Sequence, residues 1–156
     1  MLQSAVGEPM KCHPCPRGVG KVAILKPLHH VDLLLNEAMS QTGKKLTIVS
    51  RISTEWLCSS TSYLDYLVID SDFFDVIDDV IDACRQVRDE APELPIILIS
   101  SDVQGDDFSS DRLWICDATL RKPFAEGRLK EAAASALENN TAFRQRMPKC
   151  PLMAPT

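Results

Sequence analysis

Two short apolar runs separated by an amphipathic segment constrain the fold of this chain more than any other feature. The first run ends at Ile69 and is followed directly by Asp70, and the second is the uninterrupted PIILI of 95–99. Between them, apolar residues recur at steps of three and four over 73–89, which predicts a helix. Continuous apolar strands joined by a helix are typical of a parallel sheet covered on both faces. We therefore expect a β-α-β unit with a right-handed crossover.

The same alternation extends along most of the chain. Beside the strands at 66–69 and 95–99, strands are expected at 22–25, 45–49 and within 113–120, and further helices are expected at 30–42, within 53–63 and at 124–138. The polar stretch 101–111 is expected to be a loop with one helical turn at most. The fold class is therefore α/β, with a five-stranded parallel sheet in a three-layer sandwich. Ligand sites in such folds lie outside the carboxyl ends of the strands.

The ends of the chain differ from its centre in composition. Residues 1–20 are rich in Pro and Gly and are expected to be a flexible lead, whereas 141–156 carry three prolines and are expected to be an irregular tail. The remaining 21–140 suit a single domain. No apolar run is long enough to span a membrane, and the first residues lack the apolar core of a signal peptide, so a cytoplasmic location is expected.

Charge and cysteine content exclude several classes of function. The formal net charge of -5 argues against nonspecific nucleic-acid binding, which needs a basic face. The six cysteines are spread through a chain with an ample core, so they do not indicate a disulfide scaffold. Cys12 and Cys15 have metal-ligand spacing, but no second pair completes four zinc ligands. We expect no metal site, no membrane partner and no nucleic-acid partner.

Polar residues follow four of the expected strands. Lys26 follows the first, Asp70 ends the third, Ser100 and Ser101 end the fourth, and Lys122 follows the fifth. Because parallel strands end at one edge of a sheet, an acid, a hydroxyl and two ammonium groups are expected to face one another there.

Three segments in this order resemble the receiver domain of bacterial two-component response regulators. They are DYLVID at 65–70, LPIILISS at 94–101 and CDATLRKPF at 116–124. The resemblance covers about 21–138 and implies a receiver-like (flavodoxin-like) fold and a role in phosphorelay signal transduction.

The resemblance also implies a role for each matching residue. Asp70 takes the position of the phospho-accepting aspartate, and Ser100 takes that of the Ser or Thr that contacts the phosphoryl group. Lys122 takes the position of the conserved lysine, and the bond before Pro123 is often cis in this family.

The chain departs from the receiver pattern at two places. Active receivers hold Mg²⁺ with a pair of acids after the first strand, where this chain has Lys26 and Pro27. Asp70 and Asp72 alone are too few ligands for the ion, so no cofactor is expected. Thr119 stands where the family has an aromatic that rotates inward on phosphorylation. We expect Lys26 and Lys122 to pair with Asp70.

The predicted pocket therefore surrounds a phospho-acceptor position that is expected to be inactive, and it holds no catalytic residue. It comprises Asp70 with Lys26, Asp72, Ser100, Ser101, Thr119, Lys122 and Pro123. The predicted function is a stand-alone pseudo-receiver, not an enzyme, that acts through contacts with a kinase, a regulator or an output protein. A homodimer through 102–138 is a further expectation.

Three alternatives remain open from the sequence. Asp70 could be a working, Mg²⁺-dependent phospho-acceptor. The strand-end pocket could instead bind a small molecule. The acids of 75–82 are expected to form a solvated helix face, and a docking patch for a basic partner is the alternative.

Overall fold

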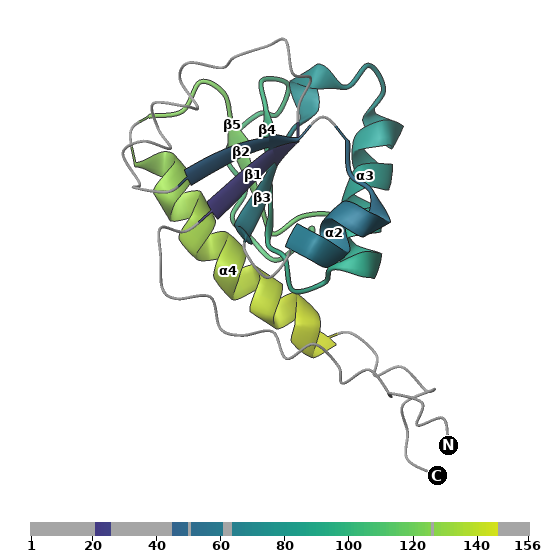
Figure 1. The fold of residues 1–156 in the computed structure, drawn as a ribbon. Helices are drawn as coiled ribbons and strands as arrows, with labels where there is room; N and C mark the ends of the chain where they lie inside the picture. Colours follow the sequence, from purple (N-terminus) through teal and green to yellow (C-terminus); the bar gives the residue numbers. More distant parts are fainter. Residues whose placement is uncertain (1–20, 26–44, 50, 61–63, 126, 147–156) are drawn as a thin grey trace, which may run out of the picture.

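The computed structural model describes residues 21–25, 45–49, 51–60, 64–125 and 127–146 (Figure 1). The expected lead at 1–20, the expected helix at 30–42 and Lys26 lie outside the described residues.

Parallel strands form the centre of the molecule, in the order β2-β1-β3-β4-β5 (Figure 1). Their bounds are β1 Lys21–Leu25, β2 Lys45–Val49, β3 Leu64–Asp70, β4 Ile96–Ser100 and β5 Ala118–Arg121. Every neighbouring pair in this order is parallel. The predicted α/β class is therefore confirmed, and β3, β4 and β5 carry the strand ends described below.

Helices cover both faces of the sheet (Figure 1). Helices α2 (Thr54–Ser60) and α3 (Ile77–Glu90) lie on one side, and α4 (Arg128–Arg146) lies on the other. Successive side chains of β3 point to opposite faces of the sheet and contribute to two hydrophobic cores. Leu67 and Ile69 pack on the α3 side, and Val68 packs on the α4 side. Since both faces are covered, Leu67–Ile69 of β3 and Ile96–Ile99 of β4 are all apolar and buried, which explains the uninterrupted runs in the sequence.

The helix predicted from 73 begins later than expected. Ser71–Phe73 form a single 3-10 turn, and α3 starts at Ile77 after extended residues Phe74 and Val76. The prediction was wrong here because the first residues after β3 bind neighbouring strands instead of continuing a helix. The hydroxyl of Ser71 donates to the carbonyl of Ile99 at 3.0 Å, which holds the turn against β4.

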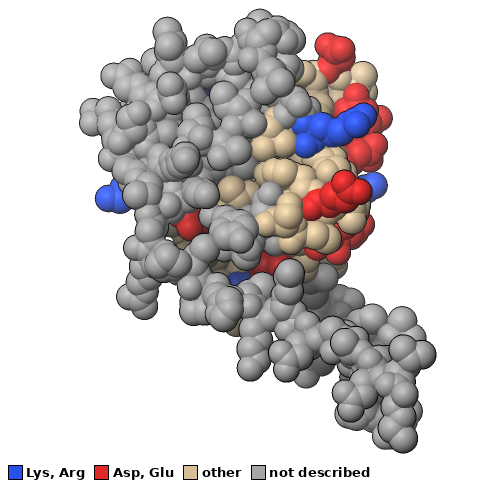
Figure 2. All heavy atoms as spheres, in the orientation of Figure 1, with Lys and Arg blue, Asp and Glu red and all other residues tan. Residues whose placement is uncertain are grey.

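Acidic side chains line the outer face of α3. Asp78, Asp79 and Asp82 are exposed, as is Asp75 just before the helix. Figure 2 shows acidic side chains gathered on the side of the molecule where α3 lies in Figure 1. This arrangement fits the predicted solvated face.

The connection between β4 and β5 is a loop, as predicted for 101–111. Residues 101–117 contain no helix, and β5 begins at Ala118, near the end of the range 113–120 in which a strand was expected. Leu113 and Cys116 are buried, so the apolar residues before β5 pack in the core from a turn. A single antiparallel bridge joins Asp107 to Thr119 along the edge of β5.

The last helix is longer than predicted at one end and shorter at the other. It begins at Arg128, after Gly127 with a positive φ of 84°, and it ends at Arg146. The predicted irregular tail from 141 is therefore wrong for 141–146, because Phe143 is buried on α4 and extends its core face. None of the described helices is long and apolar enough to cross a membrane.

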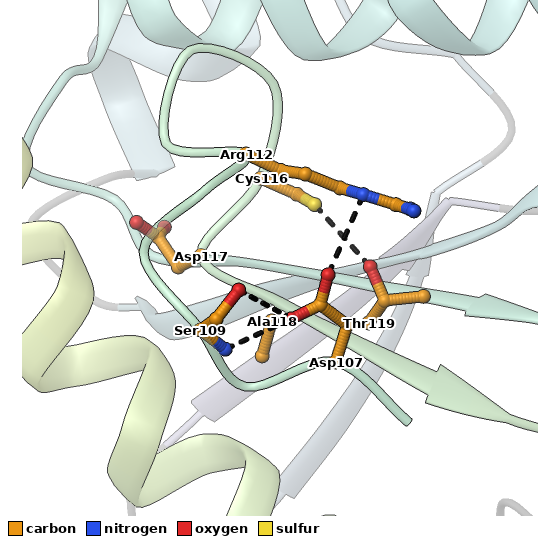
Figure 3. A pocket seen from close by; sticks show the side chains of 7 residues that line it. All are labelled: Asp107, Ser109, Arg112, Cys116, Asp117, Ala118 and Thr119. Atoms are coloured by element: carbon orange, nitrogen blue, oxygen red, sulfur yellow. Dashed lines mark hydrogen bonds and ion pairs between the residues drawn. The ribbon is translucent and has the colours of Figure 1, made fainter. Parts of the chain in front are cut away.

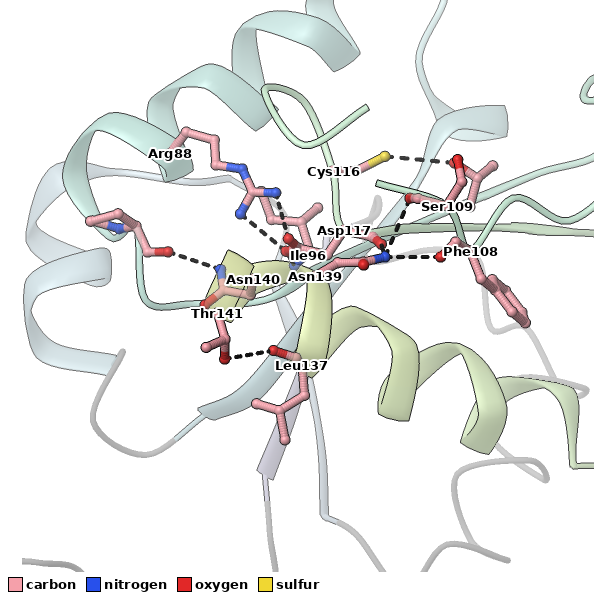
Figure 4. Close-up of polar contacts among 12 residues, drawn as sticks. Arg88, Ile96, Phe108, Ser109, Cys116, Asp117, Leu137, Asn139, Asn140 and Thr141 are labelled. Atoms are coloured by element: carbon pink, nitrogen blue, oxygen red, sulfur yellow. Dashed lines mark hydrogen bonds and ion pairs between the residues drawn. The ribbon is translucent and has the colours of Figure 1, made fainter. Parts of the chain in front are cut away.

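A buried ion pair joins α3 to the amino end of β5 (Figure 4). Arg88 donates through both terminal nitrogens to Asp117, at 3.0 and 2.8 Å, and the amide of Ile96 donates to the same carboxylate at 2.7 Å. Asn140 of α4 donates to the carbonyl of Pro92 beside this pair. This network lies at the amino ends of β4 and β5, opposite the predicted pocket, and the sequence reasoning did not identify it.

Candidate functional site

The register of the sheet brings three polar strand ends together. Asp70 is the last residue of β3 and pairs with Ile99, one residue before Ser100 at the end of β4. Lys122 follows β5 directly, and its amide donates to the carbonyl of Ser100 at 2.9 Å. The carboxyl-end location predicted from the parallel topology therefore holds for these three residues.

One ammonium group lies between two carboxylates at this edge. The Nζ atom of Lys122 is 2.7 Å from Oδ2 of Asp70 and 3.1 Å from Oδ2 of Asp72. The Asp70 side chain is 0% exposed, whereas Lys122 and Asp72 are 18% and 23% exposed. Lys122 also lies 5.5 Å from the ring centre of Phe73, so the 3-10 turn covers one side of the ammonium. The peptide bond between Lys122 and Pro123 is cis, and Pro123 is exposed.

Asp72 reaches across the strand ends to the residues after β4. Its carboxylate accepts from the amide of Ser101 at 3.0 and 3.2 Å, and it lies 3.4 Å from the hydroxyl of Ser100. The hydroxyl of Ser100 also accepts from the amide of Asp102 at 3.1 Å. The Asp72 carboxylate therefore points into the site, and its contacts are donors from β4 and β5.

Asp70 plays a different part in the same turn. Its Oδ1 accepts from the amide of Asp72 at 3.2 Å, which caps the 3-10 turn, while its Oδ2 accepts from Lys122. Asp70 is therefore both the cap of the short turn and the partner of Lys122.

The three charged groups have shifted pKa values with distinct causes. Burial raises the pKa of Asp70, and this outweighs the lowering by Lys122 and by the Asp72 amide. Burial also opposes ionisation of Asp72, but hydrogen bonds from Ser101 and Lys122 prevail and lower its pKa. Burial disfavours the charge of Lys122, yet Asp70 and Asp72 together raise its pKa. Lys122 is thus held as a cation by its two acidic neighbours.

Thr119 does not join this group. It is buried on β5, its hydroxyl lies 3.6 Å from Sγ of Cys116, and it lines a small hollow with Asp107, Ser109 and Arg112 (Figure 3). The interior volume of this hollow is about 0 Å³, so it is not a small-molecule pocket, since such pockets begin at roughly 300 Å³. Neither Asp70 nor Lys122 lines this hollow.

The carboxylates of the site do not fit a magnesium ion as they stand. Both contact Lys122, so a divalent cation would have to displace the ammonium from each. After the last residue of β1 the sequence continues with Lys26 and Pro27, which supply no carboxylate. Within the described residues, no three His, Cys, Asp or Glu side chains gather closely enough to hold a metal ion.

Ser71 is a contributor to the site that the sequence reasoning missed. It holds the 3-10 turn to β4 and so fixes the direction of Asp72. The signal for it was the Asp-Ser-Asp order directly after a buried strand, because such residues favour local turns that compete with a helix.

Solved receiver domains share this fold. A response regulator receiver domain protein from Clostridium thermocellum matches with a TM-score of 0.57 and 16% identity, over 80% of this chain and 98% of its own. A response regulator receiver protein from Sinorhizobium medicae matches with a TM-score of 0.55 and 24% identity, over 78% of this chain and 97% of its own.

A third similar structure contains a metal ion. It is the receiver domain of a sensor histidine kinase from Pseudomonas aeruginosa, solved with magnesium coordinated in its active-site cleft, with a TM-score of 0.56 and 18% identity over 78% of this chain and 99% of its own. No protein-family model and no curated protein matches the sequence. The three structural matches show that the chain has the fold of response regulator receiver domains.

Proposed function

We propose that this chain is a receiver-like signalling module that acts through protein contacts and does not accept a phosphoryl group in a Mg²⁺-dependent reaction. The observation that carries the proposal is the double contact of Lys122 with Asp70 and Asp72, at 2.7 and 3.1 Å. Asp70 and Asp72 thus share the ammonium of Lys122 at the ends of β3 and β5.

Electrostatics explains why this arrangement disfavours phosphorylation. Phosphoryl transfer to a carboxylate depends on positioning and on neutralising the charge of the phosphoryl oxygens. A metal ion would normally supply that charge. Here the cation present is shared by two acids, and the sequence after β1 adds no carboxylate that could hold a second one.

Without phosphoryl transfer, we propose that the module signals by binding other proteins, and we propose no catalytic activity. Two large apolar side chains within 102–138 are exposed, Trp114 at 68% and Leu137 at 58%. Trp114 packs edge-on against Phe143 at 5.8 Å, so it is held in place at the surface. Tryptophan is enriched in the cores of protein interfaces. A kinase, a regulator, an output protein or a second copy of this chain is the proposed partner class.

The test of the phosphorylation proposal is labelling with acetyl phosphate and Mg²⁺, followed by intact mass spectrometry. We expect no increment of one phosphoryl group. A stoichiometric increment that disappears in Asp70→Ala, but persists in the control Asp75→Ala, would show that Asp70 is a working acceptor. Asp75 is a suitable control because it is an exposed acid of the same connection.

The test of the contact surface is the oligomeric state and partner binding of surface variants. If the face within 102–138 is used, Trp114→Ala and Leu137→Ala should lower the sedimentation coefficient of a dimer or weaken capture of a defined partner. Val76→Ala is the matched control, because Val76 is 50% exposed but lies outside this region. Equal effects of all three substitutions would argue against the assignment of this face.

A further inference from the structure

Donors from separate elements converge on the carboxylate of Asp72. The amide of Ser101 approaches at 3.0 Å, the hydroxyl of Ser100 lies at 3.4 Å, and the ammonium of Lys122 lies at 3.1 Å. Ser100 is the last residue of β4, Ser101 follows it, and Lys122 follows β5. Because the parallel sheet fixes both strand ends, we expect the three donors to keep their spacing without Asp72.

This donor set is chemically suited to a small oxyanion. A backbone amide, a hydroxyl and an ammonium aimed at one point form charge-assisted hydrogen bonds with carboxylate, phosphate or sulfate alike. Preorganised donors of this kind stabilise negative charge at little reorganisation cost. The lowered pKa of Asp72 is consistent with a carboxylate that receives such bonds.

Two contacts of the 3-10 turn hold the Asp72 carboxylate in the donor set. The hydroxyl of Ser71 binds the carbonyl of Ile99, and Oδ1 of Asp70 binds the amide of Asp72. Because the carboxylate belongs to the same chain, it has a high effective concentration at the donors. A free anion could displace it only at a higher concentration. Helix capping does not account for its direction, because the cap of this turn is Asp70.

We propose that Ser100, Ser101 and Lys122 form an oxyanion cradle that this chain fills with its own Asp72 carboxylate. The excluded ligand class is a tetrahedral oxyanion such as inorganic phosphate or sulfate. The proposal deepens the proposed function, on which it rests, because a permanently filled cradle makes the strand edge insensitive to added phosphate. The contacts of Asp72 then hold the ends of β3, β4 and β5 in one arrangement, which does not depend on phosphorylation.

The experiment is an amide-resolved NMR titration of the ¹⁵N-labelled chain with sodium phosphate, at ionic strength matched with sodium chloride. In the wild-type chain we expect the Ser101 amide to show no saturable shift. In Asp72→Ala the same amide should shift saturably, with at least about tenfold tighter binding than in the wild type. Asp75→Ala, which also removes one acid nearby, should behave as the wild type. Sulfate should compete with phosphate in Asp72→Ala.

Either of two results would overturn the cradle. One is a Ser101 amide that does not respond in Asp72→Ala, and the other is an equal response in the wild type. If Asp72→Ala does not fold, Asp72→Ser is titrated under the same criteria, since it also removes the charge and shortens the side chain. Labelling by acetyl phosphate is measured separately on the wild type. A positive labelling result with a phosphate-responsive Asp72→Ala would reject the proposed function while leaving the cradle intact.

Discussion

Removal of the ammonium at position 122 tests the electrostatic account of the site. In Lys122→Met the side chain keeps a similar length, but Asp70 loses its partner at 2.7 Å and Asp72 loses its partner at 3.1 Å. Asp70 is fully buried, so water cannot replace the lost contact without opening the site. The substitution therefore leaves an uncompensated charge in a low-dielectric environment.

The expected loss follows from the burial of the two acids. Truncating one member of a buried ion pair costs about 3–5 kcal/mol. Since Lys122 is 18% exposed and Asp72 is 23% exposed, water screens one side of the site, and the lower end applies. We expect a loss of about 3 kcal/mol in the free energy of unfolding, which is roughly a 150-fold change in the folding equilibrium.

A double-mutant cycle with Asp70→Asn separates charge from packing. Asp70→Asn alone should lower the free energy of unfolding by only about 1 kcal/mol. The amide oxygen can still accept from the Asp72 N–H, and a neutral side chain avoids the free-energy cost of burying a charge. In the Lys122→Met background the same change removes the uncompensated charge. The double variant should therefore be about 2 kcal/mol more stable than the sum of the single effects predicts.

The assay is urea denaturation followed by circular dichroism, at about pH 5 and about pH 8. In Lys122→Met the pKa of Asp70 in the folded state rises further above its unfolded value of 3.8, so the deficit is small when Asp70 is protonated and grows as the pH rises through the folded pKa. The deficit should thus be larger at the higher pH. Additive effects, or a deficit independent of pH, would refute the reasoning.

Two predictions concern the core. Arg88→Met should destabilise the chain by about 3–5 kcal/mol in urea, since Arg88 and Asp117 are 4% and 0% exposed, and a loss no larger than that of exposed Arg85→Met would contradict it. Burial raises the pKa of Cys84 from 9.0 to about 12, so the unfolded thiol ionises first and stability falls as the pH rises above 9.0. When the pH rises from about 8 to about 10, the free energy of unfolding should fall by about 1.4 kcal/mol less in Cys84→Ala than in the wild type. The exposed control Cys58→Ala should behave as the wild type.

The location of the site was predictable because it depends on topology alone. The apolar runs before Asp70 and Ser100 are continuous since both faces of β3 and β4 are covered, and parallel strands end at one edge. Lys122 meets Asp70 because it follows β5 directly at the same edge. The functional meaning of these positions stays a prediction until labelling is measured.

The direction of Asp72 was not predictable from the sequence. It depends on a contact with Ser101, 29 residues away, and on a 3-10 turn held by Ser71 against β4. Apolar periodicity had extended the helix back to Phe73, because periodicity records which side chains are apolar and not where strand-end contacts interrupt the backbone. Tertiary hydrogen bonds decided the local structure here.

The length of α4 was missed for a related reason. Asn139, Asn140 and Thr141 are poor helix formers, so the sequence favoured an end near 138. In the structure Asn139 donates to the carbonyls of Phe108 and Asp117, which ties the helix to the loop before β5 (Figure 4). Asn139 and Asn140, which weaken the helix in isolation, are thus bound to residues outside it, whereas Thr141 donates to Leu137 of the same helix.

The balance of charge at the strand edge bears on whether the position of Asp70 could carry a phosphoryl group. The described site holds two carboxylates and one ammonium, so a dianionic phosphoryl group on Asp70 would add its charge next to Asp72 and compete with it for Lys122. Asp70→Asn removes the acceptor and leaves the donors bound to Asp72. Asp72→Ala removes the carboxylate that the Ser101 amide and the Ser100 hydroxyl contact, while Lys122 keeps its contact with Asp70. Each substitution removes one acidic partner of Lys122, but only Asp72→Ala should turn this edge into one that responds to phosphate.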